Sequence, residues 1–168
     1  MVILGIDPGL NATGYGAVEA QGERMRAMAA GTIEPSSRGP MGRRLAELYE
    51  ALDQIIRRTQ PAVAVLEAVF THHAFVTTAA MMAHARGAIC LLSEQRGVPL
   101  VEYLPTRIKK SVTGHGRASK EQLARAVGSW LACDVEAWPS DATDALALAI
   151  AHARIARTDA VLHEQAAG

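Results

Sequence analysis

Long apolar runs are missing from this sequence. No uncharged apolar stretch approaches the ~20 residues that a membrane-spanning helix requires, and the N-terminus lacks the pattern of a signal peptide. Hydrophobic residues nevertheless make up 49% of the 168 residues, and a chain of this length buries roughly two-thirds of the surface that it exposes when unfolded. We therefore expect a soluble, cytoplasmic protein with one substantial core and no membrane partner.

Cysteine is also scarce, and internal repeats and low-complexity tracts are absent. The two cysteines, Cys90 and Cys133, lie far apart without a CxxC pair, which argues against a disulfide framework or a zinc site. We interpret both as reduced thiols without a functional role. No convincing linker divides the chain, so we expect a single domain over residues 1–157, followed by a tail, residues 158–168, that is partly helical or frayed.

Net charge is absent as well, because 17 basic residues balance 17 acidic ones. This balance at first argues against a nucleic-acid partner, but the charges are segregated along the chain. Between Pro105 and Arg125 lie six basic residues and one acidic residue, Glu121. Such a cluster is typical either of a solvated helix face or of a surface that binds phosphates.

The hydrophobic periodicity predicts strands first and helices afterwards. Three β-rich runs over residues 2–7, 14–20 and 24–34 indicate an antiparallel meander. Two further strands are expected at 62–67 and 98–103, and helical spacing predicts helices at 43–58, 76–95 and, at the end, 141–156. This order requires an α/β fold with a mixed five-stranded sheet and helices on its faces.

Four acidic residues occupy positions that could bring them together. Asp7 and Glu67 end the first and fourth predicted strands, and both would emerge at one sheet edge if those strands are parallel neighbours. Asp141 and Asp144 lie three residues apart, on one face of the first turn of the last helix. Burying four like charges together requires cations, and oxygen ligands suit Mg²⁺ or Mn²⁺.

Each acid also has a purely structural interpretation. Asp7 begins the turn signal Asp-Pro-Gly. Asp141 and Asp144 would favour the macrodipole at the start of a helix. Glu67 interrupts an apolar run, and a strand end does not need an acid. The conjunction of the four therefore favours a metal site over four separate structural roles.

Several stretches of the chain resemble the RuvC family, bacterial Holliday junction resolvases with a ribonuclease-H-like fold. The matching stretches are LGIDPGLNATGYG, LEAVF, HARG, VEYLPTRIKKSVTGHGRASKEQ and DATDALALAIAHA. They follow the order of the family and together are very specific. The resemblance implies a ribonuclease-H-like, five-stranded mixed sheet flanked by helices on both faces.

Carried over position by position, the resemblance implies an acidic cluster that holds two Mg²⁺ ions, for which Mn²⁺ may substitute. Its members would be Asp7, Glu67, Asp141 and Asp144. Lys109 and Lys120 would complete the catalytic set beside the cleaved phosphate. The DNA-binding residues would be Phe70, Arg107, Lys109, Lys110, Arg117 and Lys120. Phe70 would stack on or wedge between bases, and its structural alternative is a core aromatic.

The implied activity is a structure-specific endonuclease that resolves four-way DNA junctions by two symmetric metal-dependent nicks during homologous recombination and DNA repair. Two nicks need two sites, which a homodimer supplies. The helix over 76–95 is the expected dimer interface because small and adaptable residues would let two helices approach. These residues include Ala79, Met82, Ala83 and Gly87. A branch-migration motor complex of the RuvA and RuvB type is a further implied partner.

The chain departs from the family pattern after Phe70, where THHAF replaces the usual Lys-Asn pair and adds one residue. His72, His73 and, further along, His115 are typical of solvated loops, with weak phosphate contacts as the alternative.

Two other functions stay open. A junction-binding protein would need the basic stretch but not the acids, and GIDPGLNATGYG also resembles the phosphate loop of actin-like ATPases, which use two related domains.

Overall fold

The order of the elements follows the periodicity of the sequence. The computed structural model describes residues 1–36, 38–68, 76–135 and 138–166. The strands are β1 (Val2–Asp7), β2 (Thr13–Gln21), β3 (Arg24–Ile33), β4 (Val63–Glu67) and β5 (Leu100–Tyr103). The helices are α1 (Met41–Thr59), α2 (Val76–Gln95), α3 (Pro105–Thr113), α4 (Lys120–Leu131) and α5 (Ser140–Ala166).

The strands form one mixed sheet in the order β3-β2-β1-β4-β5. β1 pairs antiparallel with β2 and parallel with β4, which confirms the predicted meander and the predicted neighbours. β5 is shorter than the predicted strand because Pro99 has no N–H for the ladder, although its carbonyl accepts a hydrogen bond from Ala64 N–H (2.8 Å).

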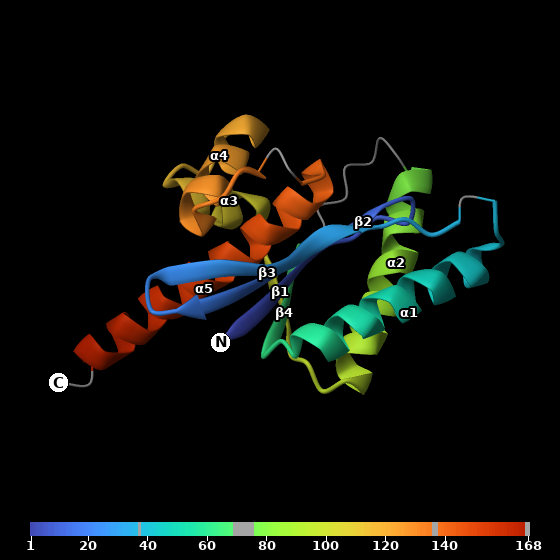
Figure 1. Ribbon diagram of the computed structural model, residues 1–168, viewed down its shortest axis with the longest axis horizontal. Coiled ribbons are helices and arrows are strands. Elements are labelled where there is room, and N and C mark those ends of the chain that lie inside the picture. Colours follow the sequence, from blue (N-terminus) through green and yellow to red (C-terminus); the bar gives the residue numbers. More distant parts are fainter. Residues whose placement is uncertain (37, 69–75, 136–137, 167–168) are drawn as a thin grey trace.

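Helices cover both faces of the sheet, as the sequence predicts (Figure 1). Helices α3, α4 and α5 pack on one face, over a core that includes Ile3 and Val65. Helices α1 and α2 pack on the other face, over a core that includes Leu4 and Leu66. Neighbouring residues of one strand thus serve different cores, because successive side chains of a strand point to opposite faces.

Helix α5 is longer than the sequence analysis predicts. It begins at Ser140 and continues to Ala166, so that most of the expected tail, residues 158–168, is helical. No proline or glycine interrupts the chain between Arg157 and Ala166, and Arg157 forms an ion pair with Glu23 (2.8 Å) in the turn after β2. The absence of a helix breaker therefore lets the helix run past the sheet.

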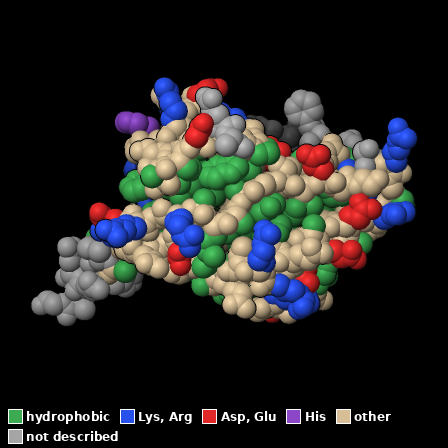
Figure 2. Space-filling view, in the orientation of Figure 1, with side chains coloured by type: hydrophobic (Ala, Val, Ile, Leu, Met, Phe, Trp, Pro, Cys, Tyr) green, Lys and Arg blue, Asp and Glu red, His purple; other side chains and the backbone are tan. Residues whose placement is uncertain are grey.

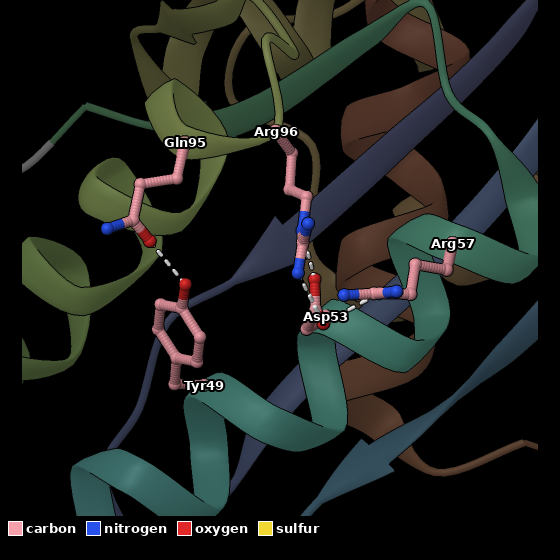
Figure 3. A network of polar contacts seen from close by, with 5 residues as sticks. All are labelled: Tyr49, Asp53, Arg57, Gln95 and Arg96. Atoms are coloured by element: carbon pink, nitrogen blue, oxygen red, sulfur yellow. Dashed lines mark hydrogen bonds and ion pairs between the residues drawn. The ribbon is translucent and has the colours of Figure 1, made fainter.

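Helix α1 is connected by a polar network to the C-terminal end of α2 (Figure 3). Tyr49 of α1 donates a hydrogen bond to Gln95. Asp53 of α1 pairs with Arg57 one turn later (2.9 Å) and with Arg96, which follows α2. These contacts fix the position of α2 on the sheet independently of its apolar face.

The surface carries charges of both signs. On the face seen in Figure 2, hydrophobic side chains are exposed in the middle, where β3 forms the sheet edge, and basic and acidic side chains are interspersed around them. In the described part of the chain, no helix is both long and apolar enough to cross a membrane. Cys90 and Cys133 are free thiols, as expected.

Candidate active site

Asp7 and Glu67 lie at the same edge of the sheet because β1 and β4 are parallel and pair Ile6 with Leu66. The alternation of side chains along a strand also determines the face of the sheet to which Asp7 and Glu67 point. Ile3 and Val65 contribute to the core beneath α5, and Asp7 and Glu67 are each an even number of residues further along the same strands. Both carboxylates therefore face α5.

Two glycines let α5 approach this face closely. A Cβ on Gly5 would lie 1.9 Å from the carbonyl oxygen of Ala145, and a Cβ on Gly14 would lie 2.0 Å from that of Asp141. Real side chains cannot occupy such positions, so glycine is required where the backbones meet. The close approach brings the first turn of α5 to the end of β1.

The result is a cluster of three carboxylates. One oxygen each from Asp7, Asp141 and Asp144 lies within 4.8 Å of the others. Glu67 lies beside this group and lines the same cleft, whose volume is about 300 Å³. The structure therefore brings together the four acids that the sequence singled out, three of them at metal-binding distance.

Electrostatic repulsion in the cluster is strong. Burial, followed by the charges of Asp144, Glu67 and Asp141, raises the pKa of Asp7 from 3.8 to about 7. Burial and the charge of Asp144 also raise the pKa of Glu67, an effect that Lys109 opposes. A partly buried carboxylate with a pKa this high is held among negative charges that a bound cation would neutralise.

Two lysines line the cleft with the acids. Lys120 is the first residue of α4, which begins with a capping box in which the Ser119 hydroxyl accepts from Gln122 N–H (3.2 Å). Its Nζ lies 2.8 Å from Asp144 Oδ2, and this contact raises the pKa of Lys120. Lys109 reaches the cleft from α3. The structure thus places both predicted phosphate-contacting lysines beside the carboxylates.

Three other predicted DNA-binding residues, Arg107, Lys110 and Arg117, do not line this cleft. The guanidinium of Arg107 lies over the ring of Tyr103, 5.2 Å from its centre, which is a cation–π geometry. Lys110 and Arg117 are exposed, and so is His115, in the loop between α3 and α4. Phe70, together with His72 and His73, lies outside the described residues.

The residues expected at a dimer interface share the outer side of α2. Ala79 and Met82 are half-buried, and Ala83 and Gly87 are exposed. The inner side of the same helix packs into the core through Ala85, Ile89 and Leu92. The helix therefore covers the sheet with one side and leaves a surface of small residues on the other.

Two arginines near the site, the buried Arg44 and the half-buried Arg86, were not assigned a role from the sequence. Arg44 of α1 donates to the Leu10 carbonyl (3.0 Å) and to Asn11 Oδ1 (2.8 Å), in the loop that follows Asp7. Arg86 of α2 donates to the carbonyl of Glu67 (2.8 Å). Their sequence signal is weak because helices commonly carry arginines; the matching stretch HARG marked only Arg86, without indicating what it does.

The donor set of the cleft fits divalent cations such as Mg²⁺ or Mn²⁺. Carboxylate oxygens are the ligands that these hard cations prefer, and burial together with three neighbouring carboxylates raises the pKa of Asp7. An arrangement of acids over a cleft with two lysines at its side is suited to a phosphodiester substrate, whose phosphate carries negative charge.

The sheet order β3-β2-β1-β4-β5, with acids at the ends of β1 and β4 and at the start of α5, defines a protein of the ribonuclease-H-like class. Within that class, the sequence model of the family described as crossover junction endodeoxyribonuclease RuvC matches residues 3–152. The chain belongs to this family.

Individual relatives agree with this assignment. A crossover junction endodeoxyribonuclease RuvC from Thermomicrobium roseum is 41% identical over 157 residues, covering 94% of this chain and 95% of the relative. One from Azorhizobium caulinodans is 42% identical and covers 90% and 88%. The structure of T. thermophilus RuvC in complex with Holliday junction substrate superposes with a TM-score of 0.88 at 30% identity, covering 95% and 96%.

Proposed function

We propose that this protein is a metal-dependent endonuclease that resolves four-way DNA junctions by two symmetric nicks, during homologous recombination and DNA repair. The observation that carries the proposal is the cluster of Asp7, Asp141 and Asp144. Asp7 and Asp144 of this cluster line a cleft together with Lys109 and Lys120. Membership of the family supports the proposal that the substrate is a four-way junction, since one solved relative is described in complex with Holliday junction substrate.

The four carboxylates, Asp7 among them, would hold two Mg²⁺ ions, for which Mn²⁺ can substitute. Such a pair of ions supplies an activated water and stabilises the departing oxygen of a phosphodiester. Glu67, Asp141 and Asp144 complete the ligand set from β4 and α5. The raised pKa of Asp7 supports this role, because a cation at the cluster would favour its ionised form.

The lysines act on the phosphate itself. Lys120 Nζ is positioned 2.8 Å from Asp144 Oδ2 at the wall of the cleft, and from there it can donate to a phosphate oxygen as negative charge develops. Lys109 contributes a second positive charge from α3. Both therefore stabilise the transition state and weakly assist binding.

The DNA path is proposed to continue over α3 and the loop before α4. Lys110 and Arg117 are exposed there, and Arg107 is exposed in the first turn of α3. These side chains would contact backbone phosphates, which carry no base identity. Phe70 is proposed to stack on bases near the junction centre.

Two nicks require two active sites related by a two-fold axis, so we propose a homodimer formed through the outer side of α2. The exposed Ala83 and Gly87 would let the two helices approach closely. A branch-migration motor of the RuvA and RuvB type is the proposed further partner, and the cytoplasm is the proposed location.

The test uses a labelled four-way junction and a linear duplex of the same sequence, each with Mg²⁺, with Mn²⁺ or with EDTA. We expect paired nicks in the junction only, and only with a divalent cation. Junction binding without cleavage under every condition would instead identify a binding protein. ATP hydrolysis without cleavage would favour the relationship to actin-like ATPases.

A further inference from the structure

Arg86 connects three elements beneath the active site. Its side chain extends from α2 and is only 15% exposed. One terminal nitrogen, Nη1, donates to the main-chain carbonyl of Glu67 at the end of β4 (2.8 Å). The other, Nη2, forms an ion pair with Glu102 of β5.

These contacts fix the peptide unit that follows Glu67. Its carbonyl oxygen accepts from Arg86, and its N–H, which belongs to Ala68, donates to the carbonyl of Tyr103 (2.8 Å). Both polar groups of the peptide are therefore held, one by a helix and one by the neighbouring strand. Because this peptide sets the backbone at Glu67, it also sets the direction in which the carboxylate leaves the strand.

An arginine suits this position better than a lysine. The planar guanidinium presents separate donors in a fixed fork, so that one side chain can bind a carbonyl and a carboxylate at once. The charges that shift the pKa of Glu67 are those of Asp144 and Lys109. Arg86 therefore acts on Glu67 through the backbone and leaves the carboxylate oxygens available.

We propose that Arg86 is a positioning residue for Glu67, which aligns this carboxylate with the Asp7 cluster so that the site binds divalent metal. The effect on cleavage rests on the proposed function, but the effect on metal binding does not. Residues that orient the ligands of a metal typically change its affinity by about 10–100-fold when they are replaced.

The test replaces Arg86 by Met, which keeps the unbranched apolar part of the side chain but removes the guanidinium donors, and by Lys, whose single nitrogen cannot reproduce the two separate donors of the guanidinium. Mn²⁺ binding to the full chain without DNA is measured by electron paramagnetic resonance, well below the melting temperature. We expect affinity to fall about 10-fold in Arg86→Met and by less in Arg86→Lys. The Mg²⁺ concentration for half-maximal junction cleavage should rise in parallel, with turnover at saturating Mg²⁺ largely retained.

Two controls separate positioning from general stability. Arg96→Lys weakens another arginine ion pair, with Asp53, at the far end of α2 (Figure 3), and should lower the melting temperature without changing Mn²⁺ affinity. Glu102→Gln removes the ion pair of Arg86 but leaves its hydrogen bond to Glu67, so we expect affinity within about twofold of the wild type.

Unchanged Mn²⁺ affinity in Arg86→Met would overturn the proposal, and so would an equal loss in Arg96→Lys or Glu102→Gln. If Arg86→Met does not fold, Arg86→Lys tests the proposal instead. Its loss of Mn²⁺ affinity should then exceed the loss in either control variant. A wild-type protein that binds Mn²⁺ but leaves the junction intact would refute the proposed function, whereas the binding data would still test Arg86.

Discussion

At the scale of single residues, Asp7 determines the character of the site. A carboxylate at the end of a buried strand is costly unless a partner compensates its charge. Here the neighbouring charges are Asp144, Glu67 and Asp141, which raise its pKa further after burial has done so. Among the described residues, the positive charge of Lys120 lowers this pKa. The metal-free cluster is therefore under electrostatic strain.

Replacing Asp7 by Asn should abolish cleavage, because the amide keeps the shape but is a poor metal ligand. In EDTA, junction binding should persist or tighten, since one charge that repels the phosphates is gone. Gel shifts in EDTA and cleavage assays with Mg²⁺ and Mn²⁺ measure both effects. Glu50→Gln, which removes an exposed acid on α1, is the control for net charge. Normal cutting by Asp7→Asn would refute the metal mechanism.

The same pKa predicts how stability depends on pH without metal. Between the ordinary pKa of 3.8 and the folded value of about 7, the folded state holds a proton on Asp7 that the unfolded state has lost. The contribution of this group is therefore present at low pH and is lost as the pH rises through that window. In EDTA, the melting temperature of the wild type should therefore fall relative to that of Asp7→Asn as the pH rises across this range. An equal pH dependence in both proteins would contradict this assignment.

Lys120→Ala should reduce turnover by ~10²-fold or more, as the loss of one transition-state donor commonly does, while it weakens junction binding only modestly. Single-turnover cleavage and gel shifts separate the two effects. Lys110→Ala is the matched control, because Lys110 is exposed and does not line the cleft. It should weaken binding and its salt dependence with little effect on turnover. If Lys120→Ala behaves like Lys110→Ala, then Lys120 is only a surface phosphate contact.

At the scale of elements, the packing of α5 on β1 and β2 assembles the site. Gly14 pairs with Asp7 across the two antiparallel strands, and its missing side chain leaves room for the backbone of Asp141. Gly5 does the same for the next turn of α5. The glycines of the first two strands therefore leave the room that lets α5 approach the sheet. This close approach brings Asp141 and Asp144 of the helix to Asp7 of β1.

Gly14→Ala should displace the start of α5 and separate Asp141 from Asp7. We expect a loss of stability of about 1–3 kcal/mol or more, as for other overpacked sites, together with weaker Mn²⁺ binding. Thermal melts and metal titrations measure the two. Gly42→Ala, in α1, is the matched control because nothing lies within 4 Å of its added Cβ. It should preserve metal binding and stability. Full metal affinity in Gly14→Ala would show that the close approach is not needed.

At the scale of the whole molecule, helix α2 serves two surfaces. Its inner side packs on the sheet and carries Arg86 to the end of β4. Its outer side presents Ala83 and Gly87, the proposed dimer contact. The proposed partner subunit would therefore lie against the same helix whose Arg86 donates a hydrogen bond to the main-chain carbonyl of Glu67.

Ala83→Glu should convert the proposed dimer to a monomer of 17.8 kDa, because two like charges would meet across the two-fold axis. Sedimentation measures the mass, and a cruciform substrate distinguishes paired from single nicks. We expect paired nicking to be lost. Ala160→Glu, an equivalent change at an exposed position of α5, should leave both properties unchanged. A dimer that survives Ala83→Glu would exclude this side of α2 as the interface.

The periodicity of the sequence determined the elements and their order. Alternating apolar residues define the strands, and the ends of two of them place Asp7 and Glu67 at one edge once the strands are parallel. The spacing of Asp141 and Asp144 places both in one helical turn. These features are local, because they depend only on the geometry of a strand or a helix. The four acids were recognisable for that reason, and the family resemblance reinforced them.

Only the tertiary structure decided which groups meet. That three of the four acids share a 4.8 Å cluster depends on how closely α5 can approach the sheet, which the glycines of β1 and β2 permit. The contact between Arg86 and the carbonyl of Glu67 joins residues that are 19 positions apart, on different elements. Such contacts depend on distances across packed layers, and no periodicity within a single element encodes them.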